Sequence, residues 1–354
     1  MTNFAAQIRR SIQHCVWDLT TACNLRCLHC ELEAGRRDPA ELSPAEALVV
    51  AHDLVDAGAR RVSLSGGEPL LRKDWPELCQ HLARAGVWVS IVTNGLLLDA
   101  ETLSRAVAAG AQAVTVSLDG LREIHDRIRV SPNGAPSRFD SAVRALQLVA
   151  ASPLRTSAIT HINRWNLPQL DELYELVETL GVELWQVQLA FPFGRVLALR
   201  EPYLIDPSEL PDLAAKLARF QQKGRVRIAP ADSIGYYDRH EPLLRINRDG
   251  RRSFWMGCMA GCLGVAIASN GDVKGCPALP QEFVVGNVRN EPFGAIWADA
   301  SRFAYNTEWR EELLEGGCAQ CDFRRICRAG CTAMAYALTG TIYDNPFCLQ
   351  RVRS

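Results

Sequence analysis

The chain has 354 residues, of which 48% are hydrophobic and 22% are charged, proportions typical of a globular protein with one large domain or a large and a small one. The formal net charge of −1 gives no electrostatic reason to expect nucleic acid or an acidic membrane surface as a partner, and neither is predicted. No apolar stretch has the length of a membrane span, and the first residues lack the pattern of a secretory signal.

From Cys15 to Arg195, short β-rich segments alternate with amphipathic helix patterns. We expect strands at residues 15–20, 61–65, 87–92, 113–118, 156–162 and 183–190. Because single helices separate these strands, the strands cannot pair as hairpins, and a parallel sheet with right-handed crossovers is expected. The sequence therefore predicts an α/β fold whose reactive residues lie on the loops after the carboxyl ends of the strands.

The helices between these strands have recognisable ends. Ser43 is suited to cap a helix that has Pro44 at its first position and Glu46 closing a capping box, and Gly58 marks its end. Three further segments show the same signals, and we expect N-terminal caps at Asp74, Asp99 and Asn166, with Gly110 and Gly181 ending the second and third of these helices.

Beyond Arg195 the alternation ends. A helix is expected at 207–222 and an extended segment at 226–229, followed by irregular chain. We expect a first domain at residues 1–200, a bridging region at 201–252 and a cysteine-rich domain at 253–354. In the last of these, residues 264–276 are typical of a hairpin, in which Asn270 and Gly271 suit a type I′ turn.

Three cysteines, Cys23, Cys27 and Cys30, follow the first predicted strand with C-x3-C-x2-C spacing, and residues 66–69 read Gly-Gly-Glu-Pro after the second. A [4Fe–4S] cluster needs four ligands, so three thiolates on one short loop leave one iron open for a substrate or cofactor. With these motifs the chain resembles the radical S-adenosylmethionine (SAM) superfamily. In that family the open iron chelates SAM, and electron transfer from the cluster yields methionine and a 5′-deoxyadenosyl radical.

This resemblance implies a partial (β/α)6 TIM-like barrel followed by a small cysteine-rich iron–sulfur domain. It also implies roles in binding SAM. Gly66 and Gly67 would let the backbone approach the methionyl group, Glu68 would accept from its ammonium, and His29 stands where the family usually has an aromatic residue near the adenine.

Three residues at predicted strand ends, Asn94, Ser117 and Asp119, match positions at which related enzymes contact the ribose or the methionyl group. Each also has a simpler interpretation, since Asn94-Gly95 and Asp119-Gly120 are ordinary turn signals. His125, Asp126 and Arg129 follow the fourth strand in a pattern familiar from related enzymes, without separate roles assigned.

A second group of cysteines resembles the SPASM extension of radical SAM enzymes, which carries two auxiliary [4Fe–4S] clusters. Transferring the family pattern assigns Cys258, Cys262, Cys276 and Cys331 to the first cluster and Cys318, Cys321, Cys327 and Cys348 to the second. If Cys262 is not a ligand, the first auxiliary cluster is open and available to substrate. A four-thiolate site also suits zinc, which remains an alternative for either group.

The two motifs account for eleven of the thirteen cysteines, which argues against a disulfide framework and favours a reducing cytoplasm as the location. The remaining Cys15 and Cys79 lie among apolar neighbours and are expected to be core residues.

Candidate catalytic residues are Arg195, which follows the sixth strand and could orient a carboxylate, and Tyr236, which could line a substrate channel. A surface salt bridge and core packing are the respective alternatives. Arg324, Arg325 and Arg328 flank the auxiliary cysteines and could dock an acidic flavodoxin or ferredoxin, with a solvated basic face as the alternative.

The spacing of the auxiliary cysteines resembles the peptide-modifying branch that includes the maturases of pyrroloquinoline quinone and mycofactocin precursors. The resemblance implies an enzyme with three [4Fe–4S] clusters that oxidatively modifies a ribosomally made peptide by crosslinking, decarboxylation or epimerisation. Alternatives are a radical SAM enzyme acting on a small molecule or tetrapyrrole, a sulfatase-type protein maturase, and a non-catalytic electron carrier. Because little chain precedes Cys15, we expect either that a separate small protein binds the leader peptide or that the substrate needs none.

Overall fold

The computed structural model describes residues 10–132, 134, 137–199, 202–231, 234–246 and 253–353. In these residues ten strands form one sheet in the order β10-β9-β8-β1-β2-β3-β4-β5-β6-β7. Neighbouring strands from β1 to β7 all run parallel. The strands are β1 (His14–Asp18), β2 (Arg61–Ser65), β3 (Trp88–Thr93), β4 (Ala113–Ser117), β5 (Arg155–Ile162), β6 (Leu184–Leu189), β7 (Arg227–Pro230), β8 (Gly264–Ile267), β9 (Asp272–Lys274) and β10 (Gly286–Asn287).

The six predicted parallel strands are all present, with ends within two residues of the expected ones. The predicted α/β fold with a partial barrel is therefore confirmed. The barrel is open, because β7 and β10 are the two edges of the sheet. The extended segment expected at 226–229 forms β7, which adds a seventh parallel strand beyond β6.

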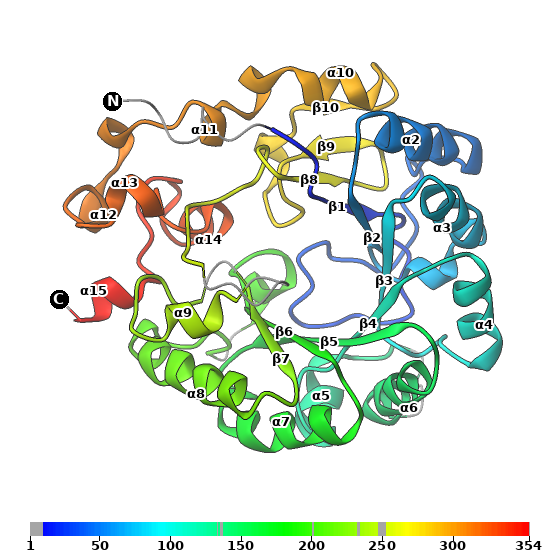
Figure 1. Cartoon of the computed structure of the whole chain (residues 1–354), viewed down its shortest axis with the longest axis horizontal. Coiled ribbons are helices and arrows are strands. Elements are labelled where there is room, and N and C mark those ends of the chain that lie inside the picture. The colour runs from blue at the N-terminus through cyan, green and yellow to red at the C-terminus, as the bar shows by residue number, and fades with distance from the viewer. Residues whose placement is uncertain are drawn as a thin grey trace.

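Helices cover the outside of the curved sheet (Figure 1). Burial of their apolar faces is the main stabilising term, at about 1.5–3 kcal/mol for each large aliphatic side chain; on α2, for example, Val50 and Leu54 are buried. The helices are α2 (Pro44–Asp56), α3 (Trp75–Arg84), α4 (Ala100–Ala108), α5 (Arg122–Ile128), α6 (Arg138–Ala150), α7 (Leu170–Thr179), α8 (Leu210–Lys223), α9 (Glu241–Leu244), α10 (Phe293–Ala298), α11 (Ala304–Thr307), α12 (Gly316–Ala319), α13 (Arg324–Cys327), α14 (Thr332–Thr339) and α15 (Leu349–Arg353).

All four predicted caps stand at the N-terminal end of a helical element, and two of them cap it through their side chains. Ser43 closes the expected capping box with Glu46, and Asp99 accepts a hydrogen bond from the Thr102 N–H. Asp74 and Asn166 stand, as predicted, at the N-terminal ends of α3 and of the 3₁₀ turn Leu167–Gln169 that leads into α7, but their side chains make no capping hydrogen bond. The Asp74 carboxylate pairs with the Arg72 guanidinium instead.

The amide of Asn166 makes its hydrogen bonds outside the helical turn that follows it. Its Nδ2 donates to the carbonyl oxygens of Asp119 and His161, both at 2.8 Å. Asn166 thereby ties together the loops that follow β4 and β5, at the end of the sheet where the candidate site lies.

The cysteine-rich segment joins the barrel through its hairpin. β8 pairs parallel with β1 and antiparallel with β9. The predicted type I′ turn is wrong, because the turn begins one residue earlier: the Gly271 N–H donates to the Ala268 carbonyl, and Gly271 has a positive φ of 90° while Asn270 does not. This is a turn closed by a glycine in the left-handed region, in which only Gly271 needs glycine.

The same segment is also fastened to α2. Arg289 donates to the Glu46 carboxylate and to the carbonyls of Ala40 and Glu41, and the Phe293 N–H donates to Asp53. In the described part of the chain, no helix combines the length and the apolar character needed to cross a membrane.

Candidate metal centre

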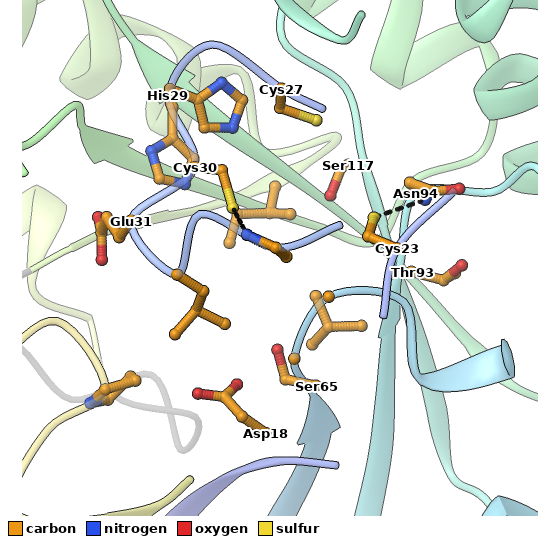
Figure 2. Close-up of a pocket in the computed structure, with 18 of the residues that line it drawn as sticks. Asp18, Cys23, Cys27, His29, Cys30, Glu31, Ser65, Thr93, Asn94 and Ser117 are labelled. Atoms are coloured by element: carbon orange, nitrogen blue, oxygen red, sulfur yellow. Dashed lines mark hydrogen bonds between the residues drawn. The ribbon is translucent and has the colours of Figure 1, made fainter. Parts of the chain in front are cut away.

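The three cysteines of the C-x3-C-x2-C motif line one cavity of about 320 Å³ at the carboxyl end of the barrel strands (Figure 2). Their loop leaves β1 and closes on itself, since the Gly35 N–H donates to the Thr21 carbonyl at 2.8 Å and the Cys23 N–H donates to the Gly35 carbonyl at 3.2 Å. Among the described residues that line this cavity there is no fourth cysteine. The loop therefore offers three thiols to whatever the cavity binds.

Each of these sulfurs accepts an N–H hydrogen bond from the protein. Such donors stabilise a thiolate more than a neutral thiol, because a thiol sulfur is a weak acceptor. The pairs are Leu25 N to Cys23 Sγ at 3.4 Å, Ala34 N to Cys30 Sγ at 3.4 Å, Arg129 Nη1 to Cys27 Sγ at 3.9 Å and Asn94 Nδ2 to Cys23 Sγ at 3.9 Å.

Burial works in the opposite direction. It raises the pKa of Cys23 to about 12 and that of Cys27 to about 11, although Arg129 lowers the latter. Thiolates held in so apolar a place need a bound cation, and metal coordination deprotonates a thiol outright. The donor set therefore fits an iron–sulfur cluster held by three protein ligands.

The Gly-Gly-Glu-Pro segment clamps the start of the cysteine loop. The Gly67 N–H donates to the Thr20 carbonyl at 2.7 Å, and the Glu68 N–H donates to the Ala22 carbonyl at 2.8 Å. A Cβ on Gly66 would lie 2.5 Å from the Thr20 oxygen, and one on Gly67 would lie 2.3 Å from the Ala22 oxygen. Both glycines line the cavity, but the close approach that requires glycine is to this backbone.

Glu68 lies behind the cavity wall and is fully buried. Its carboxylate accepts from Thr93 Oγ1 at 2.8 Å, from the Asn94 N–H at 2.9 Å and from the Leu70 N–H at 3.3 Å. Burial raises its pKa to about 7, against the effect of these hydrogen bonds. In the structure Glu68 is thus the link that holds the loop after β3 against the loop after β2.

Asn94 and Ser117 line the cavity as expected of residues at strand ends, whereas Asp119 does not. Asp119 is fully buried and accepts from Arg129 Nε at 2.7 Å and from the His161 N–H at 2.9 Å. Burial alone would raise its pKa, but the Arg129 guanidinium and the neighbouring imidazoles of His29, His161 and His125 together hold the pKa below the usual range. Asp119 therefore orients Arg129, which in turn donates to the Cys27 sulfur.

His29 also lines the cavity, and its ring stacks on that of His161 with centroids 4.6 Å apart. Burial lowers the pKa of His29 well below its usual value, so the imidazole is neutral at pH 7. Its Nε2 lies 3.7 Å from an oxygen of Asp119. The stacked pair gives this wall of the cavity a flat aromatic face.

Arg195 holds the cysteine loop from the opposite side. Its Nε donates to the Cys27 carbonyl at 2.8 Å and its Nη1 to the Ala34 carbonyl at 3.0 Å. The preceding Gly194 packs so closely that a Cβ there would lie 2.5 Å from the Cys30 oxygen. The alternative interpretation, a surface salt bridge, is absent from these contacts, and Arg195 is a positioning residue that lines the cavity.

A second group of thiols lines a separate cavity of about 650 Å³ near the C-terminus. Its cysteines are Cys318, Cys321, Cys327 and Cys348, the four residues that the sequence assigns to the second auxiliary cluster. The Cys318 sulfur accepts from the Asn345 N–H at 3.4 Å. Four thiols around one cavity fit a fully ligated cluster.

A third group lies around Tyr305, whose burial and electrostatic contacts with Cys258, Cys276 and Cys262 raise its pKa. Arg328 stands between this group and the second one, since its guanidinium donates to the Cys258 carbonyl at 3.2 Å and also interacts with Cys327. Cys331 begins α14, three residues beyond Arg328, and its membership of this group stays a prediction.

Within the residues that the structure describes, no three His, Cys, Asp or Glu side chains are arranged to hold a single metal ion.

Two family models match the chain: one described as the radical SAM superfamily, over residues 17–177, and one described as an iron–sulfur cluster-binding domain, SPASM, over residues 258–322. The chain is 30% identical over 345 residues to an AdoMet-dependent heme synthase of Methanosarcina barkeri, covering 95% of each protein. It is 34% identical over 337 residues to the mycofactocin maturase MftC of Mycobacterium tuberculosis, covering 93% of this chain and 80% of that protein. The chain belongs to the radical SAM superfamily.

Solved structures show the same fold for this radical SAM enzyme. Streptococcus suis SuiB bound to S-adenosylmethionine superposes with a TM-score of 0.76 at 18% identity, over 97% of this chain and 79% of that one. The structure titled native anSMEcpe with bound AdoMet gives a TM-score of 0.72 at 17% identity, over 96% and 95% of the two chains. The SPASM match begins at Cys258 and ends at residue 322, so the cysteine-rich segment contains the SPASM domain expected from the sequence.

Some residues that shape the site of this radical SAM enzyme could not be assigned from the sequence. The sequence assigns no separate role to Arg129 and does not mark Glu41 as a site residue. Glu41 is buried and accepts from Thr20 Oγ1 at 2.6 Å and from the Thr21 N–H at 2.7 Å, which fixes the point where the cysteine loop begins. A lone glutamate in a polar segment gives no signal of such a contact.

Tyr236, the other candidate catalytic residue, does not line the cluster cavity. It is buried, and its ring lies 5.2 Å from that of Trp255, so the structure favours the packing alternative.

The basic residues near the auxiliary cysteines are also engaged within the chain. Arg324 and Arg325 both pair with Glu311, at 2.6 Å and 2.7 Å, and Arg328 is buried. The contacts of these three residues give no support to the predicted docking face for an acidic electron donor.

Proposed function

We propose that this radical SAM enzyme oxidatively modifies a ribosomally made peptide, by crosslinking, decarboxylation or epimerisation. The observation that carries the proposal is the cavity lined by Cys23, Cys27 and Cys30 with no fourth cysteine among its described lining, which is the donor set for a cluster with one open iron. The identity to MftC, a mycofactocin maturase, supports a peptide as substrate.

When bound, the open cluster would supply the electron that cleaves SAM to a 5′-deoxyadenosyl radical. The chain's own residues position the reactants and exclude water. Under the proposal, Gly66, Gly67 and Asn94 line the methionyl end of SAM, while His29 and Ser117 line the adenosyl end. Glu68 and Asp119 act through the loops and side chains that they hold.

The proposal includes three [4Fe–4S] clusters. Beyond the SAM-binding one, the second auxiliary cluster would be held by the four cysteines of the cavity near the C-terminus. The first would be held by Cys258, Cys262, Cys276 and Cys331. The division into a barrel (1–200), a bridging region (201–252) and an iron–sulfur domain (253–354) belongs to this proposal.

A second candidate substrate is a tetrapyrrole. The match to an AdoMet-dependent heme synthase extends over 95% of both proteins, and a Fe-coproporphyrin III synthase from the same organism, Methanosarcina barkeri, is 28% identical over 94% of this chain. These relatives favour a small-molecule reaction as strongly as MftC favours a peptide.

The proposed SAM chemistry is tested by anaerobic reconstitution, reduction with dithionite and chromatographic measurement of 5′-deoxyadenosine. The proposal predicts formation of this product at about twelve irons per chain, the content of three cubane clusters. A fully loaded protein that forms none would be an electron carrier or scaffold, and the proposal would be wrong.

The substrate class is tested in the same preparation by offering two substrates in parallel. One arm contains a short peptide encoded beside the gene, and the other contains iron coproporphyrin III. A mass change in the peptide supports the first candidate, whereas a mass change in the porphyrin with an unaltered peptide supports the second.

The partners expected under this proposal are a separate leader-binding protein for the peptide and a flavodoxin or ferredoxin as electron donor. A reducing cytoplasm is the proposed location, because eleven cysteines serve as thiolate ligands in this account.

A further inference from the structure

The lumen of the partial barrel is polar and hollow. In closed (β/α)8 barrels, layers of bulky branched side chains fill the interior. Here Ser63, Ser90, Thr115 and Ser157 occupy inward positions on four successive strands and line a cavity of about 590 Å³. Ser63 Oγ lies 2.8 Å from Ser90 Oγ, so small side chains bonded to one another leave the centre open.

This serine-lined cavity lies at the other end of the barrel from the cysteine loop. It is lined by the residues with which the strands begin, among them His14 on β1, Arg61 on β2, Trp88 on β3 and Arg155 on β5. Four residues line both this cavity and the cluster cavity, which makes the two adjoining parts of one lumen: His14, Ser63, Thr115 and Gln186.

The charged residues that line the serine-lined cavity are three arginines and one glutamate: Arg61, Arg155, Arg227 and Glu183. Glu183 accepts a hydrogen bond from the Thr156 N–H at 3.2 Å. Within the described residues no ion pair joins any of the three arginines to a carboxylate.

Two of these arginines, which line the same cavity, lie within electrostatic reach of each other. Arg61 begins β2 and Arg227 begins β7, strands that are separated in the sheet, yet Arg227 is close enough to lower the pKa of Arg61 in addition to the effect of burial. Arg227 is held in place by donating to the Ile246 carbonyl at 2.8 Å. Arg155 packs over the Trp88 ring, 5.6 Å from its centroid.

We propose that the cavity lined by Arg61, Arg155 and Arg227 is a binding site for an oxyanion group, carboxylate or phosphate, of a small molecule. A guanidinium presents paired donors that match the oxygens of such groups, and an anion between like charges removes their mutual repulsion. The site is separate from the three thiols and does not depend on the reaction proposed above.

The test is calorimetric titration of the anaerobic, cluster-loaded enzyme with citrate and, separately, with inorganic phosphate, in chloride buffer of constant ionic strength. The proposal predicts saturable binding of at least one probe, and the tighter of the two identifies the group that the site takes. Arg61→Gln and Arg155→Gln each weaken this binding by about tenfold or more, the loss expected for a charge-assisted hydrogen bond. Arg84→Gln, an exposed arginine on α3 outside the cavity lining, leaves binding unchanged.

Thermal unfolding without either probe checks that the variants fold. Because Arg61 faces a like charge, Arg61→Gln should unfold no earlier than the parent protein in chloride alone. If Arg61→Gln does not fold, the exposed Arg155 decides the question through its own variant. The proposal is wrong if neither probe binds the parent protein, or if the folded cavity variants bind both probes as tightly as Arg84→Gln.

Discussion

The cysteine loop at the barrel and the cysteine groups of the SPASM domain bring their sulfur ligands together in two different ways. The loop carries Cys23, Cys27 and Cys30 within one short segment, which the barrel holds through backbone contacts from the loops after β2 and β6. The auxiliary groups collect cysteines from Cys258 to Cys348, across several elements. Cysteines within one loop need only that the barrel holds the loop rigidly. Cysteines from several elements come together only when those elements pack against one another.

The largest expected effect follows the loss of one cysteine from the loop at the barrel, and it distinguishes the function of that loop from that of the SPASM domain. Cys27→Ala removes one of three ligands from the loop, so formation of 5′-deoxyadenosine should fall by about a hundredfold or more, with a loss of about four irons per chain. Chromatography and iron analysis measure both quantities. Cys79→Ala, a core cysteine on α3, is the control and should keep both values. Comparable turnover in the two variants would contradict the assignment.

Cys318→Ala tests the other side of the comparison. The iron content should again fall by about four per chain, but SAM cleavage should persist, because the loop at the barrel is intact. Modified substrate should be lost. If 5′-deoxyadenosine formation falls as far as in Cys27→Ala, the two regions do not act separately.

Gly67→Ala tests whether backbone contact fixes the cysteine loop. The added Cβ would lie 2.3 Å from the Ala22 oxygen, so we expect overpacking that costs about 1–3 kcal/mol of unfolding free energy, together with weaker cluster loading. Gly294→Ala is the matched control, since a Cβ there meets nothing within 4 Å. Chemical denaturation measures the difference, and equal stabilities would show that the clamp has no such role.

Asp18 and Lys274 link the regions through charge. Burial raises the pKa of Asp18 to about 6, although Lys274 and a hydrogen bond from Ser65 lower it. The unfolded pKa is about 3.9, so the stability that this group contributes is present below that pH and is lost as the pH rises through 6.

Asp18→Asn removes this titration. Relative to the parent protein, the variant should become more stable between pH 4 and pH 7 by about 1–3 kcal/mol and then stay level. Urea denaturation at several pH values measures the change. A difference that does not vary with pH would contradict the raised pKa.

The smallest expected effect concerns the ion pair between Arg289 of the SPASM segment and Glu46 on α2, at 2.7 Å. The Arg289 hydrogen bond is the main cause that lowers the pKa of Glu46 to about 2, but both side chains are well exposed. Solvent screening limits the pair to about 0.5 kcal/mol, so Glu46→Gln should change the unfolding free energy by no more than that. A loss above about 1.5 kcal/mol would mean that this contact governs docking.

The sequence predicts the parallel strands well because each is a short β-rich segment that a helix pattern separates from the next. The prediction is incomplete at Asp74 and Asn166, which stand at helix N-termini as predicted but whose side chains bind an arginine and two carbonyls in place of helix N–H groups. A cap is a local signal, and tertiary contacts override it.

The site shows the same limit. Spacing alone brings Cys23, Cys27 and Cys30 together, and the Gly-Gly pair is placed correctly at the cavity. The sequence could not show that Arg129 and Arg195 hold the cysteine loop, because their contacts with Cys27 join segments far apart in the chain. Nor does any motif predict the arginine-lined cavity, whose members stand one to a strand.

The central claim is that the loop at the barrel leaves one iron open to SAM. Electron paramagnetic resonance of the reduced, anaerobic enzyme tests it directly, with and without SAM, in Cys318→Ala and in Cys27→Ala. The account predicts that SAM changes the signal of a cluster in the first variant and changes nothing in the second. A spectrum of Cys318→Ala that SAM leaves unaltered would contradict it.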